Sequence, residues 1–358
     1  MTDKKPESNH SLQNSAHNGK NGSEKQSQDK MGQEVQGLNR DVPTPKERRR
    51  IGLALGGGVA RGFAHIGAIR ALQRHGIEPG IVAGTSIGAV VGACYLAGKM
   101  DELEKWGRSL GRLKLLSYLD FKVKSAGLIG GHRLERLMRA DLGDGKIEDL
   151  PLPFIAVATD LITGHEVWMR NGDIVNACTA SFSLPGIFPP VERNGRFLID
   201  GALVNPVPVS VCQALGARMT IGIDLSADMI GKASLNKDKV PRITGYDMFD
   251  EAVVPQKQQK QVKKSALTRR LFRRDDDEQP SLFGVMVSSL SIIQDRITRS
   301  RLAGDPPDIH VRPHVGHIGL MEFDRVDELI AAGEASIERI LPDILAAKAV
   351  FFGEEQDQ

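Results

Sequence analysis

A serine between two glycines is the residue pattern in this sequence that could do chemistry most directly. Ser86 is the centre of a G-x-S-x-G pentapeptide with Gly84 and Gly88, directly after an apolar run and directly before a helical pattern. Glycines on either side allow the sharp strand-to-helix turn that lifts a serine hydroxyl out of a sheet, at a helix N-terminus that stabilises negative charge. The spacing predicts a nucleophilic serine, with a tight turn and an N-capping serine as the alternative.

A run of three glycines precedes this serine and predicts an anion-binding loop. Residues 51–62 have the pattern of a strand, then glycines, then a helix, which leaves backbone N–H groups without partners. A dinucleotide-binding loop requires G-x-G-x-x-G, and Arg61 or Val59 occupies a required glycine position in either register. A P-loop also fails, because no Gly-Lys-Ser or Gly-Lys-Thr closes the loop. The remaining interpretation is an oxyanion hole near Ser86.

A serine hydroxyl needs a base to become a good nucleophile, and the sequence offers two kinds. Asp200 ends a predicted strand, where open α/β sheets bind ligands, although an aspartate before Gly201 is also common in turns. His65 follows the glycines, and we expect it to make a structural hydrogen bond. Three later histidines leave a Ser-His-Asp triad open, although a nucleophile on the second strand comes too early for that fold: His310, His314 and His317.

The elements that must position these residues alternate between strands and helices. Short apolar runs predict strands at 51–55, 80–83, 154–158, 196–199 and 219–224. Helical periodicity predicts helices at 64–73, 88–97, 134–142, 174–180 and 326–345. This alternation is typical of a three-layer α/β/α domain with a mainly parallel central sheet.

Three polar segments flank or interrupt the predicted domain, which spans 49–352. Residues 1–48 have the composition of a disordered tail without a secretory signal, and 353–358 form a short acidic tail. A charged insertion or lid spans about 227–280, and its basic stretch at 257–274 is either a solvated linker or a contact for anionic lipid headgroups. The apolar stripe after it predicts a helix that packs on the core, with lipid contact as the alternative: Leu282, Met286, Leu290, Ile293 and Ile297.

Composition argues against several classes of protein. A net charge of +2 gives no support to nucleic-acid binding. Three isolated cysteines, Cys94, Cys178 and Cys212, predict neither a zinc site nor disulfides. The apolar stretch at 81–98 is rich in glycine and contains Thr85 and Ser86, so a strand, turn and buried helix explain it better than a membrane span. We expect a cytoplasmic domain with no cofactor and no metal.

The three motifs together, in this order, resemble the patatin-like phospholipases, particularly the bacterial members. The resemblance covers about residues 51–224, through motifs at 56–62, 84–88 and 200–202 and supporting segments at 158–164 and 180–189. It implies a patatin-like α/β/α fold and a Ser-Asp dyad that acts without a catalytic histidine. The substrate class that it implies is the acyl ester of a phospholipid, a lysophospholipid or another lipid.

The resemblance also implies a role for each motif residue. Ser86 is the expected nucleophile, and Asp200 is its general base. The expected oxyanion donors are the N–H groups of Gly57, Gly58 and Val59, and the supporting residues are Arg61, Gly84, Gly88 and Gly201. Val59 departs from the family, because many relatives have glycine or another small residue there. A β-branched side chain restricts the turn and narrows the mouth of the site.

Other functions stay open at this point. The same dyad could act on small esters or thioesters, or the fold could serve a non-catalytic, lipid-binding regulatory protein. For a lipid substrate we expect transient, peripheral contact with the inner face of the membrane, with 257–274 as the candidate contact.

Overall fold

The computed structural model describes residues 50–109, 135–136, 138–140, 143–228 and 282–353. They belong to one compact unit, Pro45–Gln358. The predicted tail at 1–48, the basic stretch at 257–274, most of the insertion at 227–280 and nearly all of the acidic tail at 353–358 lie outside the described residues. The predicted helix at 134–142 falls only partly on them. These assignments stay predictions.

The described residues form an eight-stranded mixed sheet in the order β5-β6-β3-β2-β1-β7-β8, with β4 paired to β3. The pairs β1–β2, β2–β3, β1–β7 and β7–β8 are parallel, whereas β4 and β6 pair antiparallel with β3 and β5 pairs antiparallel with β6. The expected mainly parallel sheet is confirmed. The strands are β1 (Ile51–Leu55), β2 (Ile81–Thr85), β3 (Phe154–Asp160), β4 (Glu166–Met169), β5 (Val191–Arg193), β6 (Arg196–Asp200), β7 (Met219–Ile223) and β8 (Ile309–Val311).

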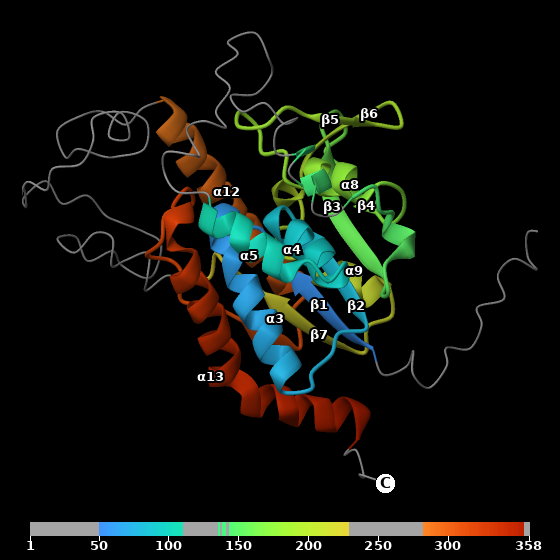
Figure 1. Ribbon diagram of the computed structural model, residues 1–358, viewed down its shortest axis with the longest axis vertical. Helices are drawn as coiled ribbons and strands as arrows, with labels where there is room; N and C mark the ends of the chain where they lie inside the picture. Colours follow the sequence, from blue (N-terminus) through green and yellow to red (C-terminus); the bar gives the residue numbers. More distant parts are fainter. Residues whose placement is uncertain (1–49, 110–134, 137, 141–142, 229–281, 354–358) are drawn as a thin grey trace, which may run out of the picture. The chain divides into compact units, whose positions relative to one another are not determined.

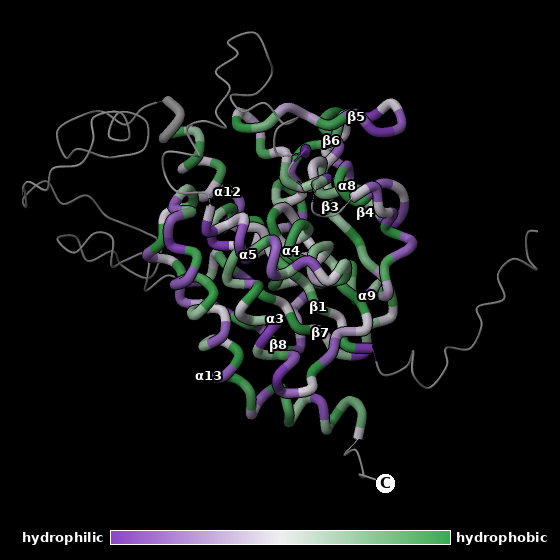
Figure 2. The backbone as a smooth tube through the Cα atoms, in the orientation of Figure 1, coloured by the Kyte–Doolittle hydropathy of each residue, from purple (hydrophilic) through white to green (hydrophobic). Residues whose placement is uncertain are grey.

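Helices cover both faces of this sheet, because successive strand residues point to opposite faces. In β1, Leu53 and Leu55 belong to a core built with α3, α4 and α13, whereas Ala54 belongs to a second core with α9. Figure 1 shows α3 and α4 together over the sheet, with α13 beside α3. In Figure 2 the central strands are mainly apolar, as strands buried on both faces should be. The α-helices are α3 (Ala64–Arg74), α4 (Ile87–Leu96), α5 (Met100–Ser109), α8 (Ile174–Ser181), α9 (Val209–Ala214), α12 (Leu282–Gly304) and α13 (Val326–Phe352).

The expected three-layer α/β/α architecture is therefore confirmed, and the five predicted strands lie within two residues of their observed ends. The sequence patterns did not predict five elements: β4, β5, β8, α5 and α9. The missed strands have three or four residues, too few to establish a period of two. Among the described helices, none has both the length and the apolar composition needed to cross a bilayer.

The apolar stripe predicted after the insertion lies on α12, and only part of it packs on the core. Met286 and Leu290 contact the buried pair Leu184 and Ile187. Ile293, by contrast, is 48% exposed. The expectation of core packing is wrong for Ile293, because that side of α12 faces away from the protein.

The register of β3 brings the ends of two other strands together. β2 pairs with the first half of β3 and ends at Thr85, opposite Val157. β6 pairs with the second half of β3 and ends at Asp200, opposite Ala158. Because β4 occupies the other edge of β3, β2 and β6 must lie end to end along the same edge. The residue after β2 and the last residue of β6 therefore meet.

Candidate active site

Ser86 occupies a strained turn between β2 and α4. Its φ of 57° and ψ of −126° lie outside the regions that L-residues usually adopt. The flanking glycines are required by close approach: a Cβ on Gly84 would lie 2.5 Å from the backbone of Ala89, and one on Gly88 would lie 2.1 Å from the Leu55 carbonyl oxygen. The G-x-S-x-G spacing thus lets the first turn of α4 pack onto β1 and β2.

The Ser86 hydroxyl and the Asp200 carboxylate are in direct contact. Ser86 Oγ donates a hydrogen bond of 2.8 Å to Asp200 Oδ2. Both side chains are buried, Ser86 at 5% exposure and Asp200 at 2%. The serine and the aspartate singled out from the sequence, 114 residues apart, are therefore brought together by the end-to-end strands β2 and β6.

Burial raises the pKa of Asp200 from its ordinary value of 3.8 to about 6. Hydrogen bonds from the Ala202 N–H and from Ser86 stabilise the charged form, but they only partly offset the loss of hydration. The Asp200 backbone is also held, because its N–H donates to the Ser183 carbonyl and its carbonyl accepts from the Thr159 hydroxyl. A carboxylate in this setting is ionised at neutral pH and still basic enough to accept a proton.

Ser181 holds the backbone of the strained turn. The Ser86 N–H donates to Ser181 Oγ at 2.9 Å, and Ser181 Oγ donates to the Val157 carbonyl at 2.6 Å. Ser181 is fully buried at the end of α8. No sequence pattern predicted a role for Ser181. Its place in the supporting segment at 180–189 is the one feature of the sequence that could have indicated that role.

The glycine-rich loop offers fewer N–H groups than the sequence predicted. The Gly57 N–H donates to the Pro206 carbonyl at 3.0 Å, so Gly57 is not a free oxyanion donor, and this part of the expectation is wrong. The N–H groups of Gly58 and Val59 have no acceptor among the described residues. Val59 has a φ of 51°, which is unusual for a β-branched residue.

Two buried side chains anchor this loop from either side. His65 Nε2 lies 2.8 Å from the Gly56 carbonyl oxygen, and burial lowers the pKa of His65 to about 4. The ring is therefore neutral at pH 7, and Nε2 carries the proton that it donates. Arg61 donates to the carbonyls of Gly316 and Ile318, so it ties the loop to the segment before α13. Both side chains thus make hydrogen bonds that hold the loop in place, and the supporting role predicted for Arg61 stays a prediction.

Comparison with known proteins identifies the family. Residues 53–212 match the family described as "Patatin-like phospholipase". An uncharacterised NTE family protein of Mycobacterium tuberculosis is 32% identical, with 80% of this chain and 89% of that protein aligned. The chain belongs to the patatin-like phospholipase family. It is therefore a carboxylic ester hydrolase by family membership.

Two further similarities are more distant. Lysophospholipase nte1 of Aspergillus fumigatus is 27% identical over 87% of this chain, which corresponds to only 19% of that protein. The solved structure of VipD from Legionella pneumophila is similar over 83% of this chain at 14% identity and a TM-score of 0.32.

The late histidines that left a triad open lie against other carboxylates. His310 Nε2 is 3.4 Å from Asp224, His314 Nδ1 is 3.5 Å from Asp228, and His317 Nε2 is 2.7 Å from Glu328. Within the part of the chain that the structure describes, the hydroxyl of Ser86 has Asp200 as its one hydrogen-bond partner. This patatin-like site thus differs from the Ser-His-Asp arrangement of other hydrolases.

No cluster of His, Cys, Asp and Glu able to hold a metal ion occurs among the described residues. The three cysteines are buried and form no disulfide with one another.

Gly201 directly follows Asp200, and a Cβ at Gly201 would lie 2.2 Å from the Val157 carbonyl oxygen. Its role in this family member is therefore to let the end of β6 approach β3.

Proposed function

We propose that this protein is a serine acyl hydrolase that cleaves carboxylic esters of phospholipids, lysophospholipids or related acyl lipids. The observation that carries the proposal is the 2.8 Å hydrogen bond from Ser86 Oγ to the buried carboxylate of Asp200. The strained turn at Ser86 and the unpartnered N–H groups of Gly58 and Val59 support it.

In the proposed mechanism Asp200 accepts the Ser86 proton as the serine oxygen attacks the acyl carbonyl carbon. The N–H groups of Gly58 and Val59 donate to the resulting oxyanion. When the intermediate collapses, protonated Asp200 returns its proton to the leaving alcohol and an acyl-serine remains. Water then attacks this ester with Asp200 again as the base, which releases the fatty acid and regenerates Ser86.

A lipid substrate is supported by the family and by the lysophospholipase name of the Aspergillus fumigatus relative. Small esters and thioesters remain the alternative for the same dyad, and non-catalytic lipid binding is the second alternative. No contact in the described structure favours either over a lipid ester.

We also propose that the protein contacts an anionic membrane surface through the outer face of α12. Three apolar side chains on this face are exposed: Val285 at 44%, Ile292 at 62% and Ile293 at 48%. Arg296 is exposed on the next turn, and Arg299 beyond it is exposed and forms an ion pair with Asp295 at 2.8 Å, so apolar and basic groups share one face. This combination suits the headgroup and acyl boundary of anionic lipid. The contact predicted for 257–274 stays a prediction.

The experiment that tests the function is hydrolysis of a p-nitrophenyl acyl ester series and of a lysophospholipid. Wild type is compared with Ser86→Ala and Asp200→Ala, and circular dichroism checks that each variant is folded. We expect wild-type turnover and no detectable turnover in either variant. His314→Ala and His317→Ala should retain wild-type rates, and an equal loss in either would favour a triad. A wild type that hydrolyses nothing would favour the binding-protein alternative.

A further inference from the structure

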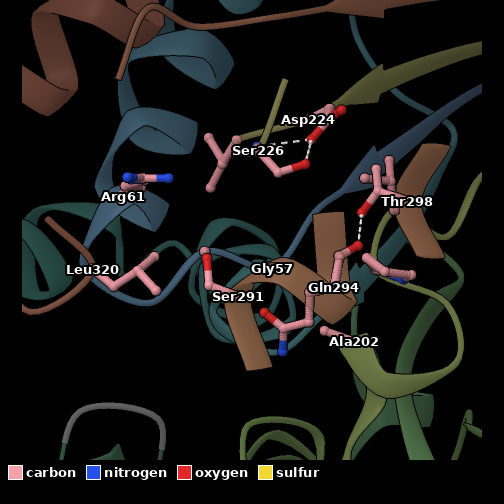
Figure 3. A pocket seen from close by; sticks show the side chains of 13 residues that line it. Gly57, Arg61, Ala202, Asp224, Ser226, Ser291, Gln294, Thr298 and Leu320 are labelled. Carbon is pink, nitrogen blue, oxygen red and sulfur yellow. Dashed lines mark hydrogen bonds between the residues drawn. The ribbon is translucent and has the colours of Figure 1, made fainter. Parts of the chain in front are cut away.

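A small pocket lies beside the glycine-rich loop, next to the proposed dyad. Its lining includes Gly57, Gly58, Ala202 and residues at the ends of β1 and β7, and α12 closes it (Figure 3). A Cβ placed on Gly57 would lie 3.5 Å from the Ser86 Cβ and 3.3 Å from the Ala202 Cβ. Gly57 and Ala202, which line the pocket, therefore also adjoin Ser86.

The helix that closes the pocket carries its side chains in an inverted pattern. The inner face of α12 presents Ser291, Gln294 and Thr298 to the pocket, whereas Ile292 and Ile293 face outward. A helix on the surface of a globular protein normally turns its apolar face inward. Polar side chains on an inner face need hydrogen-bond partners to offset their lost hydration.

Two of these polar side chains have no hydrogen-bond partner within the part of the chain that the structure describes. The Thr298 hydroxyl donates to the Gln294 carbonyl within α12. The Ser291 hydroxyl and the Gln294 side-chain amide, in contrast, make no hydrogen bond to any described residue, and Figure 3 shows both among the side chains that line the pocket. Among the described residues, the pocket thus contains a hydroxyl, an amide and the N–H of Gly58 that have no hydrogen-bond partner.

The other wall of the pocket carries a negative charge at Asp224, and Arg61 also lines the pocket. Asp224 follows β7 and is 4% exposed. Burial alone would raise the pKa of Asp224, but hydrogen bonds from His310 and Ser226 outweigh this effect and hold the pKa below its ordinary value. An ionised carboxylate accepts hydrogen bonds from hydroxyl groups and repels a phosphate in direct contact.

We propose that this pocket binds the glycerol unit of the substrate's leaving group, with Gln294 and Ser291 as specificity-determining residues. The inference rests on the proposed function of Ser86 and Asp200. Glycerol hydroxyls donate to the Asp224 carboxylate and to the Gln294 amide oxygen, and they accept from the Gln294 amide N–H and from the Ser291 hydroxyl. An acyl chain in the same place would leave these groups without partners, so the chain must leave the site elsewhere.

The test compares three esters that share a lauroyl chain: 1-lauroylglycerol, lauroyl-lysophosphatidylcholine and p-nitrophenyl laurate. Gln294→Met removes the amide and keeps the side-chain length. We expect kcat/KM for both glycerol esters to fall about five- to tenfold further than kcat/KM for the p-nitrophenyl ester, mainly through KM. Ser291→Ala should lower the same ratio about threefold. Ser289→Ala, the same change on the exposed face of α12, should leave the ratio at its wild-type value.

Other outcomes overturn the inference. Equal losses on all three esters would mean that Gln294 supports the fold or the acyl site. A loss confined to lauroyl-lysophosphatidylcholine would mean that the pocket recognises the phosphocholine headgroup instead of glycerol. An unchanged ratio while wild type hydrolyses p-nitrophenyl laurate through Ser86 would reject the pocket and leave the proposed function standing. A wild type that hydrolyses none of the three would reject both.

Discussion

The two sides of the glycine-rich loop differ in how completely their polar groups are paired. On the dyad side, the hydroxyl of Ser86 and both carboxylate oxygens of Asp200 have partners, and the Ser86 N–H is held by Ser181. On the α12 side, the side chains of Ser291 and Gln294 have no hydrogen-bond partner among the residues that the structure covers. The chemical groups are pre-positioned before substrate arrives, whereas the groups on the α12 side are left for a ligand to satisfy.

This difference indicates a division between chemistry and recognition. A general base must keep a fixed geometry and a tuned pKa, which burial and complete hydrogen bonding provide. A recognition pocket gains selectivity when its polar groups are paired only by the correct ligand. Changes on the dyad side should therefore affect all esters alike, and changes on the α12 side should affect them unequally.

Asp200→Asn should have the largest effect on activity, and it should change the dyad side without changing the α12 side. An amide cannot accept the Ser86 proton, so we expect kcat to fall about a thousandfold or more on every ester. Burial raises the pKa of Asp200 to about 6, so the folded state holds a proton that the unfolded state releases above about pH 4. The free energy of unfolding of wild type therefore falls as pH rises from about 4 to 6. A variant with an uncharged Asn at this position does not show this fall.

Urea unfolding at pH 7 measures the predicted change in the free energy of unfolding. Asp200→Asn should be more stable than wild type by about 1–3 kcal/mol, from a pKa shift of about two units. The gain should shrink at pH 4. A variant that is both inactive and strongly destabilised would show that the carboxylate is needed for folding, which would contradict the division proposed above.

Ser181→Ala should have the next largest effect, because it leaves the buried Ser86 N–H without an acceptor. We expect kcat to fall about ten- to hundredfold on all esters and stability to fall by about 1–3 kcal/mol. Ser183→Ala is the matched control, since Ser183 is also fully buried but its hydroxyl donates to the Thr179 carbonyl, away from Ser86. Equal losses of kcat in the two variants would remove the positioning role of Ser181.

The pH profile of kcat/KM tests whether Asp200 is the base. Asp200 acts as a base only when it is ionised, and its pKa is about 6. Activity on a p-nitrophenyl ester should be constant above about pH 7 and fall tenfold for each pH unit well below 6. Unfolding measurements over the same range separate this effect from acid denaturation. A profile that stays flat to pH 4.5 would exclude a base with this pKa.

Replacement of both Ile292 and Ile293 by Gln tests the outer face of α12. We expect binding to phosphatidylglycerol vesicles to weaken about tenfold in a co-sedimentation assay, because both side chains lose apolar contact with lipid. Turnover of a water-soluble ester should stay at the wild-type level. The matched control is the double change of Leu345 and Val350 to Gln, exposed apolar residues of α13. Equal weakening in both would remove the specific role of α12.

The parts of the fold predictable from sequence were those with strong local patterns. Strand β1, helix α3 and the turn at Ser86 have long apolar runs or required glycines, and the structure places them as expected. The arrangement of β2 and β6 along one edge of β3 could not be predicted in this way. It depends on pairing between residues about 40 and 70 positions apart, and no local pattern encodes such a register.

The candidate site divides in the same way. Ser86, Asp200 and the glycine-rich loop belong to motifs, but the loss of Gly57 as a donor depends on a single long-range contact with Pro206. Ser181 has no distinguishing neighbour in the sequence, so only the packing of α8 against the turn reveals its role. The polar inner face of α12 could not be predicted from the sequence. Met286, Leu290 and Ile293 follow one helical spacing, but Met286 and Leu290 pack on the core whereas Ile293 is exposed.

Val59→Gly should have the smallest effect, and it acts on the loop that separates the two sides. Val59 has a φ of 51°, and glycine adopts such a value without steric cost. Relief of this strain should outweigh the entropy that glycine gains in the unfolded state, for a net gain of about 0.5–1 kcal/mol. Activity should change less than about threefold, since the donor is a backbone N–H.

Asn194→Gly is the matched control, because Asn194 also has a φ of 51° but lies in the exposed turn between β5 and β6. Asparagine tolerates this conformation better than valine, so its replacement should stabilise the protein less. Thermal unfolding of both variants measures the difference. An equal gain at both positions would show that the Val59 side chain adds no strain of its own, and its β-branch would then matter only for the width of the mouth of the site.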